Sequence, residues 1–266
     1  MTRAAFDFRF EVNAGVGLLT LDRPDRLNSL TFEIYRQLEQ LFCDLQTDDR
    51  VKVVVLTGAG RGFCSGGDVE EIIAELLHRD AAETLKFTRM TGALIRNMRR
   101  LDKPIIAAIN GVAAGAGAVL GLASDLRVMS EEAHFAFLFT KVGLTGADMG
   151  AAHLLPKVVG AGRAAELLML GGKVEAKECL RIGLANRVVK AEQLMPEAMQ
   201  IAERLADGPG LALSMTKRML VNEQNMDLES AIEQEAQAQA LLLRCDDHRE
   251  FFASWQEKRK PRFTGK

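Results

Sequence analysis

Two segments of this sequence consist almost wholly of small residues, and each follows an apolar run rich in β-branched side chains. Residues 62–68 (GFCSGGD) follow residues 51–57, and residues 110–118 (NGVAAGAGA) follow residues 104–109. Such apolar runs are typical of strands buried in a parallel sheet, and ligands bind at the carboxyl ends of these strands. Two backbone N–H groups that converge where Cβ atoms are missing can stabilise a negatively charged oxygen, forming an oxyanion hole. Tight helix–sheet packing explains either segment alone, but the pair favours such a site.

A single carboxylate lies in a third glycine-containing segment, residues 143–150 (GLTGADMG), where Asp148 is placed on a predicted turn. A carboxylate in an apolar pocket is a better base near neutral pH, because desolvation raises its pKa. Such a group can remove a proton from one carbon of a substrate and return it to another. The alternative is that Asp148 caps a helix beginning at Met149, which is a common use of aspartate.

Composition limits the classes of protein to consider. The 266 residues include 34 basic and 36 acidic side chains, giving a formal net charge of −2, and 48% of them are hydrophobic. This balance predicts a globular protein, with no reason to expect nucleic-acid binding, which depends on clustered cations. Charges interrupt every long apolar stretch, so no membrane span is expected. The four cysteines are widely spaced, which argues against disulfides or a zinc site, and free thiols favour a cytoplasmic location.

The alternation of apolar runs with amphipathic stretches predicts the elements that position these residues. We expect strands over residues 8–12, 16–21, 51–57, 104–109 and 125–128, and helices over residues 31–45, 69–77, 81–100 and 112–123. This order implies right-handed βαβ crossovers and an α/β core. From residue 150 onward we expect almost only helix, as an appendage for assembly or as a lid.

Several motifs, in order and well spaced, resemble the crotonase superfamily, which is the enoyl-CoA hydratase/isomerase family. They are LDRPDRLNSL (21–30), VVLTG (54–58) with GFCSGGD (62–68), KPIIAAING (103–111), ASD (123–125), LPKVVG (155–160), residues 176–189 and EKRKPRF (257–263). The resemblance covers the chain from about residue 8 to its end. It implies an α/β fold of the crotonase type, a spiral of ββα turns with a C-terminal helical trimerisation region.

The same resemblance implies a domain organisation and an assembly. We predict that residues 1–200 form an acyl-CoA-binding core and that residues 201–266 form a helical oligomerisation or lid region. The expected partners are an acyl-CoA thioester as substrate and further copies of the chain, as a homotrimer or as a hexamer that is a dimer of trimers. Neither nucleic acid nor a membrane is an expected partner.

The resemblance also assigns the small-residue segments. Members of the family stabilise an enolate-like thioester oxygen with two backbone N–H groups, which by position are those of Gly67 and Ala116. The physical chemistry agrees, because the reaction builds negative charge on that oxygen. Asp68 and Val69 border the substrate, and Asp68 is expected to cap the helix that begins at Val69 rather than to take part in chemistry.

Coenzyme A binding is implied for a second group of residues. The loop around Arg26 and Leu27, with the carbonyl of Ser65, holds the nucleotide part in the family. Lys258 resembles a C-terminal basic residue that reaches a CoA phosphate, often from an adjacent subunit. For Arg26 and Lys258, the role of an ordinary exposed cation is an equal alternative.

The two glutamates of a typical hydratase are missing from this chain. Aligned without gaps, they correspond to Val119 and Phe139, which we place in the substrate pocket as apolar lining and which cannot transfer protons. Other branches of the family, including acyl-CoA double-bond isomerases, a ring-opening epoxide isomerase and an aryl-CoA dehalogenase, carry a carboxylate in the turn of Asp148. We therefore expect an isomerase of fatty acid or aromatic acid degradation, with Asp148 as its base and no metal or redox cofactor.

Alternatives to isomerisation stay open. One is hydration, a lyase reaction, by a non-standard acid/base arrangement, and another is a CoA-thioester-binding subunit without activity. Attack of Asp148 on an acyl carbon, as in the dehalogenase, also needs a histidine base. His78 and His153 are candidates for that base only by their proximity in the sequence.

Overall fold

The computed structural model describes residues 8–265, and a six-stranded sheet forms its centre. Along this sheet the strands are β1 (Phe8–Asn13), β2 (Val16–Leu21), β3 (Val53–Gly58), β5 (Ile105–Ile109), β7 (Leu126–Ser130) and β10 (Arg187–Val189). The β1–β2 hairpin is antiparallel, and every later pair is parallel. Its two turn residues, Ala14 and Gly15, both have positive φ, which matches the twist of a two-residue hairpin.

A second, four-stranded sheet consists of three-residue strands. In spatial order these are β4 (Gly62–Cys64), β6 (Val112–Ala114), β8 (His134–Ala136) and β9 (Lys173–Glu175). The helix expected over residues 112–123 is therefore wrong at its start, because β6 comes first. The strands β9 and β10 likewise correct the expectation of almost only helix after residue 150. The strands β3, β5 and β7 are each followed by a short strand and then by helix, which produces successive strand–strand–helix turns.

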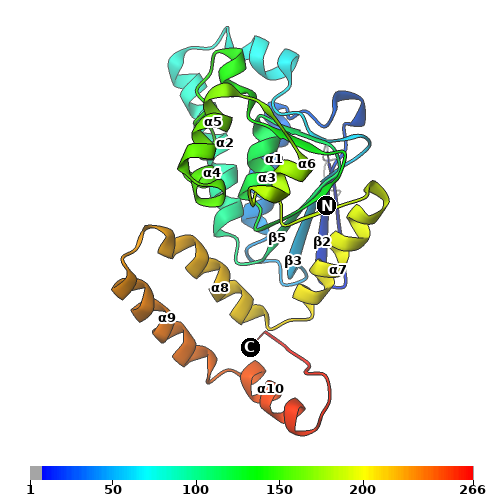
Figure 1. The fold of residues 1–266 in the computed structure, drawn as a ribbon, viewed down its shortest axis with the longest axis vertical. Helices are drawn as coiled ribbons and strands as arrows, with labels where there is room; N and C mark the ends of the chain where they lie inside the picture. The colour runs from blue at the N-terminus through cyan, green and yellow to red at the C-terminus, as the bar shows by residue number, and fades with distance from the viewer. Residues whose placement is uncertain (1–7, 266) are drawn as a thin grey trace.

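The helices cover both sheets and extend beyond them (Figure 1). In chain order they are α1 (Phe32–Asp44), α2 (Ala81–Arg100), α3 (Ala116–Ala123), α4 (Ala151–Val159), α5 (Ala161–Leu170), α6 (Ala176–Arg181), α7 (Leu194–Ala206), α8 (Gly210–Asn222), α9 (Leu228–Leu242) and α10 (Asp246–Gln256). Short helical turns are η1 (Pro24–Arg26), η2 (Val69–Ala74, a π-helix), η3 (Leu138–Val142), η4 (Ala191–Gln193) and η5 (Glu223–Asn225). No helix among residues 8–265 is long and apolar enough to span a membrane.

The central strands are buried on both faces, as their continuous apolar runs predict. Successive side chains of a strand point to opposite faces. Accordingly, Val53 and Val55 pack with the alanines of α7, whereas Val54 and Leu56 belong to the core cluster formed with α1, α2 and α3. Every residue of β3 and β5 is buried. This burial fixes the strand ends from which the small-residue segments emerge.

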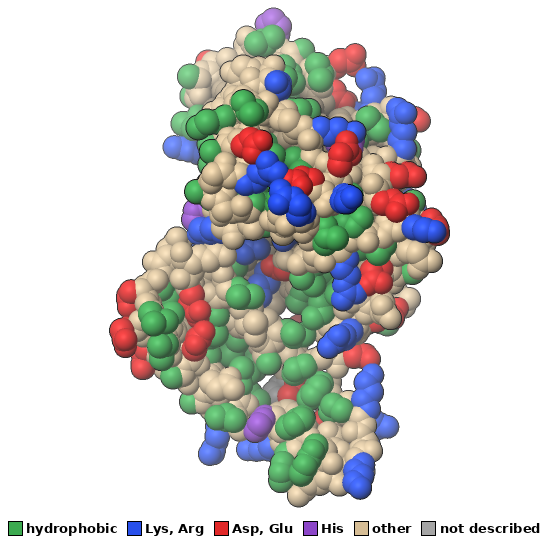
Figure 2. All heavy atoms as spheres, in the orientation of Figure 1, with side chains coloured by type: hydrophobic (Ala, Val, Ile, Leu, Met, Phe, Trp, Pro, Cys, Tyr) green, Lys and Arg blue, Asp and Glu red, His purple; other side chains and the backbone are tan. Residues whose placement is uncertain are grey.

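The last three helices leave the sheets and form a separate arm (Figure 1). No residue of α9 is buried, and α10 exposes Phe251, Phe252 and Trp255. Figure 2 shows hydrophobic side chains gathered on the surface at this end of the molecule. The predicted boundary at residues 200/201 falls within α7, which continues to Ala206 against the sheet. The division into two regions and the trimeric or hexameric assembly stay predictions.

Candidate active site

The two small-residue segments lie against each other where β4 and β6 end. A Cβ atom built at Gly117 would lie 2.1 Å from the carbonyl oxygen of Cys64. A Cβ atom at Gly66, whose φ is +104°, would lie 3.0 Å from the carbonyl oxygen of Ala114. Both approaches are too close for any larger residue without a shift of backbone. The glycines are therefore required for these two backbone segments to touch.

The N–H group of Gly67 faces the second segment. Leu30 bridges this stretch in parallel, donating to the carbonyl of Gly66 (2.8 Å) and accepting from the N–H of Asp68 (2.9 Å). In such a bridge the N–H of the middle residue points to the opposite side. Ala116 lies next to this stretch, since its nitrogen is 3.5 Å from the Cβ position built at Gly66.

Ala116 is the first residue of α3, and its N–H has no carbonyl partner within the helix. The preceding Gly115, with φ 50° and ψ −121°, turns the chain from β6 into α3. Within residues 8–265 neither the Gly67 N–H nor the Ala116 N–H donates a hydrogen bond. The positive end of the helix dipole adds to the attraction for an anionic oxygen here.

Asp148 is half-buried in the turn that leads from η3 to α4. Its Oδ1 accepts a hydrogen bond from the N–H of Met149 (2.9 Å), and its carbonyl accepts one from Ala151 (2.8 Å). The helix begins at Ala151 and its N-cap is Gly150, so the alternative that Asp148 caps a helix from Met149 is wrong. Burial raises the pKa of the Asp148 carboxyl, and the Met149 hydrogen bond opposes this only in part. No cation among the described residues pairs with it.

Asp68 has the capping role expected of it. Its Oδ1 accepts hydrogen bonds from the N–H groups of Glu70 and Glu71, both at 3.1 Å, at the start of η2. Its Oδ2 accepts a hydrogen bond from Ser29 Oγ (2.8 Å) and lies 3.3 Å from an Arg23 nitrogen. Burial raises the pKa of Asp68, but these hydrogen bonds and the Arg23 charge outweigh it and lower the pKa overall. The side chain is thus fully engaged within the fold.

The two apolar positions that replace hydratase glutamates are buried. Val119 is fully buried in α3, and Phe139 is 8% exposed in η3. Val69, by contrast, is 67% exposed at the start of η2. The histidines considered for a dehalogenase-type base are both exposed, and His153 Nε2 contacts Lys157 Nζ at 2.9 Å.

The loop expected to hold coenzyme A adjoins the first small-residue segment. Ser65 N–H donates to the carbonyl of Leu27 (2.9 Å), and Ser65 Oγ donates to the carbonyl of Arg26 (3.3 Å). Arg26 is exposed and lies 3.3 Å from the carboxylate of Glu70. Lys258 follows α10, which lies in the arm that extends away from the sheets (Figure 1), whereas Arg26 belongs to η1, directly after β2.

Tyr35 on α1 lies at the site and was not predicted there. It is the chain's single tyrosine, is only 3% exposed, and its hydroxyl lies 4.0 Å from the Cβ position of Gly67. Burial is the main cause that raises the pKa of its phenol well above the ordinary value, and Cys64 and Asp148 add to the effect. The sequence could have indicated this residue, because Tyr35 carries a polar hydroxyl on the apolar face of the amphipathic helix predicted over residues 31–45.

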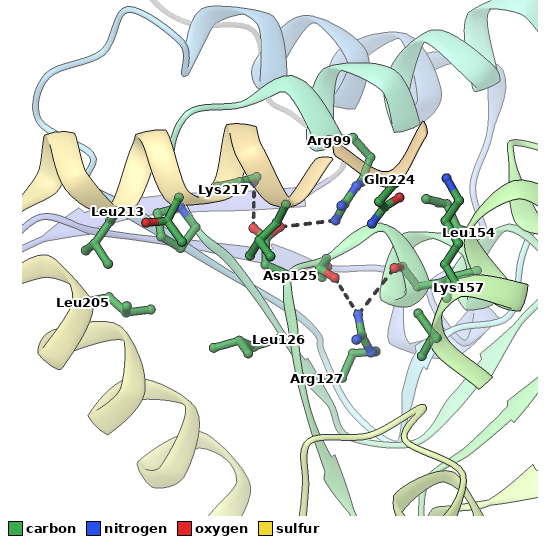
Figure 3. Close-up of a pocket in the computed structure, with 16 residues that line it drawn as sticks. Arg99, Asp125, Leu126, Arg127, Leu154, Lys157, Leu205, Leu213, Lys217 and Gln224 are labelled. Carbon is green, nitrogen blue, oxygen red and sulfur yellow. Dashed lines mark hydrogen bonds and ion pairs between the residues drawn. The ribbon is translucent and has the colours of Figure 1, made fainter. Parts of the chain in front are cut away.

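A cavity of about 330 Å³ lies elsewhere, between the end of α3 and α8 (Figure 3). Lys217 Nζ lies 2.7 Å from Asp125 Oδ2 there, and Arg99 lies 3.3 Å from Asp125 Oδ1. Arg127 donates to carbonyls at the end of α3. None of the predicted site residues lines this cavity, and the Lys217–Asp125 ion pair across it joins α8 to the core.

Metal ligands do not gather anywhere in the described part of the chain. It contains no group of three or more His, Cys, Asp or Glu side chains that could hold a metal ion. The expectation that the chain works without a metal or redox cofactor stays a prediction.

Known proteins match this chain over almost its whole length. The model of the family described as enoyl-CoA hydratase/isomerase matches residues 11–266. The 1,2-epoxyphenylacetyl-CoA isomerase of Escherichia coli K12 is 37% identical, covering 96% of this chain and 97% of its own. The short-chain-enoyl-CoA hydratase of Clostridium acetobutylicum is 30% identical, covering 94% of this chain and 94% of its own.

Solved structures agree with the fold expected from the resemblance. A Streptomyces coelicolor A3(2) crystal structure assigned as an enoyl-CoA hydratase has a TM-score of 0.96 and 50% identity, covering 100% of this chain and 98% of its own. The expected crotonase-type α/β fold is therefore confirmed. The chain belongs to the enoyl-CoA hydratase/isomerase family of the crotonase superfamily.

Proposed function

We propose that this chain moves a double bond within an acyl-CoA, with Asp148 as the base and the N–H groups of Gly67 and Ala116 as the oxyanion hole. The observation that carries the proposal is the half-buried carboxylate of Asp148, which has a raised pKa and no cation partner among residues 8–265, together with the Gly67 and Ala116 N–H groups, which donate no hydrogen bond within those residues. A base of this kind is half-ionised closer to neutral pH than an ordinary aspartate, which suits proton transfer.

The reaction needs little else from the protein. Asp148 removes a proton from the α or γ carbon, the electron pair moves into the conjugated system, and negative charge collects on the thioester oxygen. The two N–H groups stabilise that charge, and loss of one such donor costs about 3 kcal/mol. Asp148 then returns the proton to a different carbon. The apolar Val119 and Phe139 offer no second carboxylate to activate water.

Coenzyme A binding and assembly complete the proposal. The loop of Arg26 and Leu27 and the Ser65 carbonyl hold the nucleotide part, and Lys258 of an adjacent subunit reaches a CoA phosphate. This arrangement suits a trimer or a dimer of trimers, because Lys258 follows α10, in the arm that extends away from the sheets (Figure 1), whereas Arg26 belongs to η1, directly after β2.

The named relatives support both isomerisation and its alternative. The Escherichia coli protein is named 1,2-epoxyphenylacetyl-CoA isomerase, and an isomerisation, unlike a hydration, adds no water to its substrate. The Clostridium acetobutylicum protein is called a hydratase, which keeps hydration by a non-standard arrangement as the second candidate. Incubation of the protein with crotonyl-CoA in H₂¹⁸O separates them, because only hydration places ¹⁸O in the product.

Deuterium exchange at the acyl α-carbon in D₂O tests the assigned base. The wild-type protein is expected to exchange octanoyl-CoA, and Asp148→Asn is expected to lose about 10²- to 10⁴-fold in rate, the usual contribution of a general base. Both proteins should bind octanoyl-CoA equally in isothermal titration. Asp44→Asn is the matched control, since Asp44 is exposed at the far end of α1. Full exchange by the Asp148→Asn protein would show that another group is the base.

A further inference from the structure

The hydroxyl of Tyr35 is an unused hydrogen-bonding group inside the site. It makes no hydrogen bond with any residue from 8 to 265. Among the side-chain nitrogen and oxygen atoms in that part of the chain, only Glu223 Oε1 is both sealed from solvent and without a hydrogen-bond partner. The small exposed fraction of Tyr35, 3%, must therefore include its hydroxyl oxygen, which opens into a space that water or a ligand can enter.

The position of this hydroxyl is fixed by packing around its ring. Phe87 of α2 contacts the Tyr35 ring edge-on, with centroids 5.6 Å apart, and Phe32 contacts Phe87 at 4.7 Å. The hydroxyl lies 4.0 Å from the Cβ position of Gly67, one of the two proposed oxyanion residues. Asp148 is near enough to act on the phenol electrostatically. The hydroxyl therefore lies beside the proposed thioester position.

A hydroxyl in this position selects among acyl groups. In the free protein a water molecule can satisfy it, but an acyl chain that fills the pocket displaces that water. A hydrocarbon chain then leaves the hydroxyl unpaired, which is unfavourable, whereas an oxygen on the chain can accept its hydrogen bond. The phenol stays protonated at neutral pH and so remains a donor.

We infer that Tyr35 donates a hydrogen bond to an oxygen atom carried by the acyl group close to the thioester, so the preferred substrates are oxygenated acyl-CoAs rather than plain hydrocarbon ones. The acceptor is a hydroxyl, carbonyl or ring ether oxygen. This inference rests on the proposed function, because it assumes an acyl-CoA held at Gly67 and Ala116.

Binding of two thioesters that differ by one oxygen tests the inference. Isothermal titration of the full-length protein with 3-hydroxybutyryl-CoA and with butyryl-CoA gives both dissociation constants. We expect Tyr35→Phe to weaken binding of 3-hydroxybutyryl-CoA about tenfold, as loss of one neutral hydrogen bond predicts, and to strengthen binding of butyryl-CoA several-fold, because the hydrocarbon chain no longer leaves a hydroxyl unpaired. Phe87→Leu is the control, because it disturbs the same ring contacts but keeps the hydroxyl. It should change both dissociation constants by the same factor.

The other outcomes are distinct. Equal weakening of both thioesters by Tyr35→Phe would mean that the hydroxyl acts on Asp148 or on the thioester oxygen, and it overturns the inference. No change with either thioester also overturns it and leaves Tyr35 a packing residue. If wild-type protein binds neither thioester more tightly than free coenzyme A, the proposed function itself fails.

Discussion

Two aspartates in different loops of this molecule, Asp68 and Asp148, differ in their hydrogen-bond partners and in the direction of their pKa shifts. Asp68 directly follows Gly67 and is 5% exposed, with hydrogen bonds from two backbone N–H groups and a serine hydroxyl, and with Arg23 beside it. Asp148 is also partly buried, but among residues 8–265 its carboxylate accepts a hydrogen bond from a single group, the backbone N–H of Met149. The pKa of Asp68 is lowered in consequence, and the pKa of Asp148 is raised.

The difference separates a structural carboxylate from one that is free for chemistry. The lone pairs of Asp68 are already occupied by donors, so it holds η2 in place and has little capacity left for a substrate proton. Asp148 keeps most of its lone pairs, and burial without compensation makes it more basic. Asp125 follows the first pattern, since Lys217 and Arg99 contact it beside the cavity of Figure 3. Partners, more than burial, decide which role an aspartate has here.

The largest effect should come from separating the two small-residue segments, the first of which ends with Asp68. Gly117→Ala places a Cβ atom 2.1 Å from the carbonyl oxygen of Cys64, so α3 and the residues after β4 must move apart. We expect exchange at the acyl α-carbon to fall below detection and the free energy of unfolding to fall by about 3 kcal/mol, at the upper end for overpacking. Deuterium exchange and urea unfolding measure the two effects.

Gly162→Ala is the matched control for that substitution. Gly162 lies in the first turn of α5, and a Cβ atom there meets no atom within 4 Å. Alanine is the better helix former, so a gain of about 0.5 kcal/mol is expected, with no change in exchange. If the Gly117→Ala protein behaved like this control, the close contact between the segments would be wrong.

A smaller loss is expected from the structural aspartate. Asp68→Asn keeps the shape of the side chain but removes the charge that strengthens its bonds to Ser29 and Arg23. We expect the free energy of unfolding to fall by about 2 kcal/mol at pH 7, a typical value for hydrogen bonds to a charged group. Because folding lowers the pKa of Asp68, its carboxylate stabilises the folded state at pH values above the ordinary aspartate pKa. That stabilisation is lost as the pH falls through the lowered pKa. The deficit measured by urea unfolding should therefore shrink in acid, and a deficit that does not depend on pH would contradict this explanation.

Much of this framework could be predicted from local sequence. The apolar runs of β3 and β5 indicated their burial, because a strand covered on both faces has no polar alternation. The helix α1 was expected to begin near residue 31, and the hydroxyl of Thr31, its N-cap, accepts a hydrogen bond from Ile34 N–H at 3.2 Å. The cap at Asp68 was expected because aspartate is a common residue at the start of a helix. In each case the deciding interaction lies within a few residues of the signal.

What the sequence did not reveal depends on contacts between distant elements. The strands β4, β6, β8 and β9 have three residues each, too few for a periodic pattern. The start of α4 at Ala151 follows from a turn in which Met149 has a φ of 49°, an unusual conformation for this residue type. Tyr35 reaches Gly67 only because α1 packs beside the first small-residue segment, and no spacing within α1 indicates that neighbour.

The smallest predicted effect is a change in the free energy of unfolding on Asp→Asn substitution, and its sign differs between the two aspartates. A raised pKa means that folding disfavours the charged carboxylate, so the favourable contribution of Asp148 is present below the unfolded-state pKa, about 4, and is lost as pH rises through the raised folded-state value. Asn is neutral throughout and can still accept the Met149 hydrogen bond at its Oδ1. Asp148→Asn should therefore be more stable than wild type in urea unfolding at pH 7, the reverse of Asp68→Asn, and the gain should fade toward pH 4. A loss of stability at pH 7 would mean that Asp148 has a partner in the folded protein, and the contrast with Asp68 would disappear.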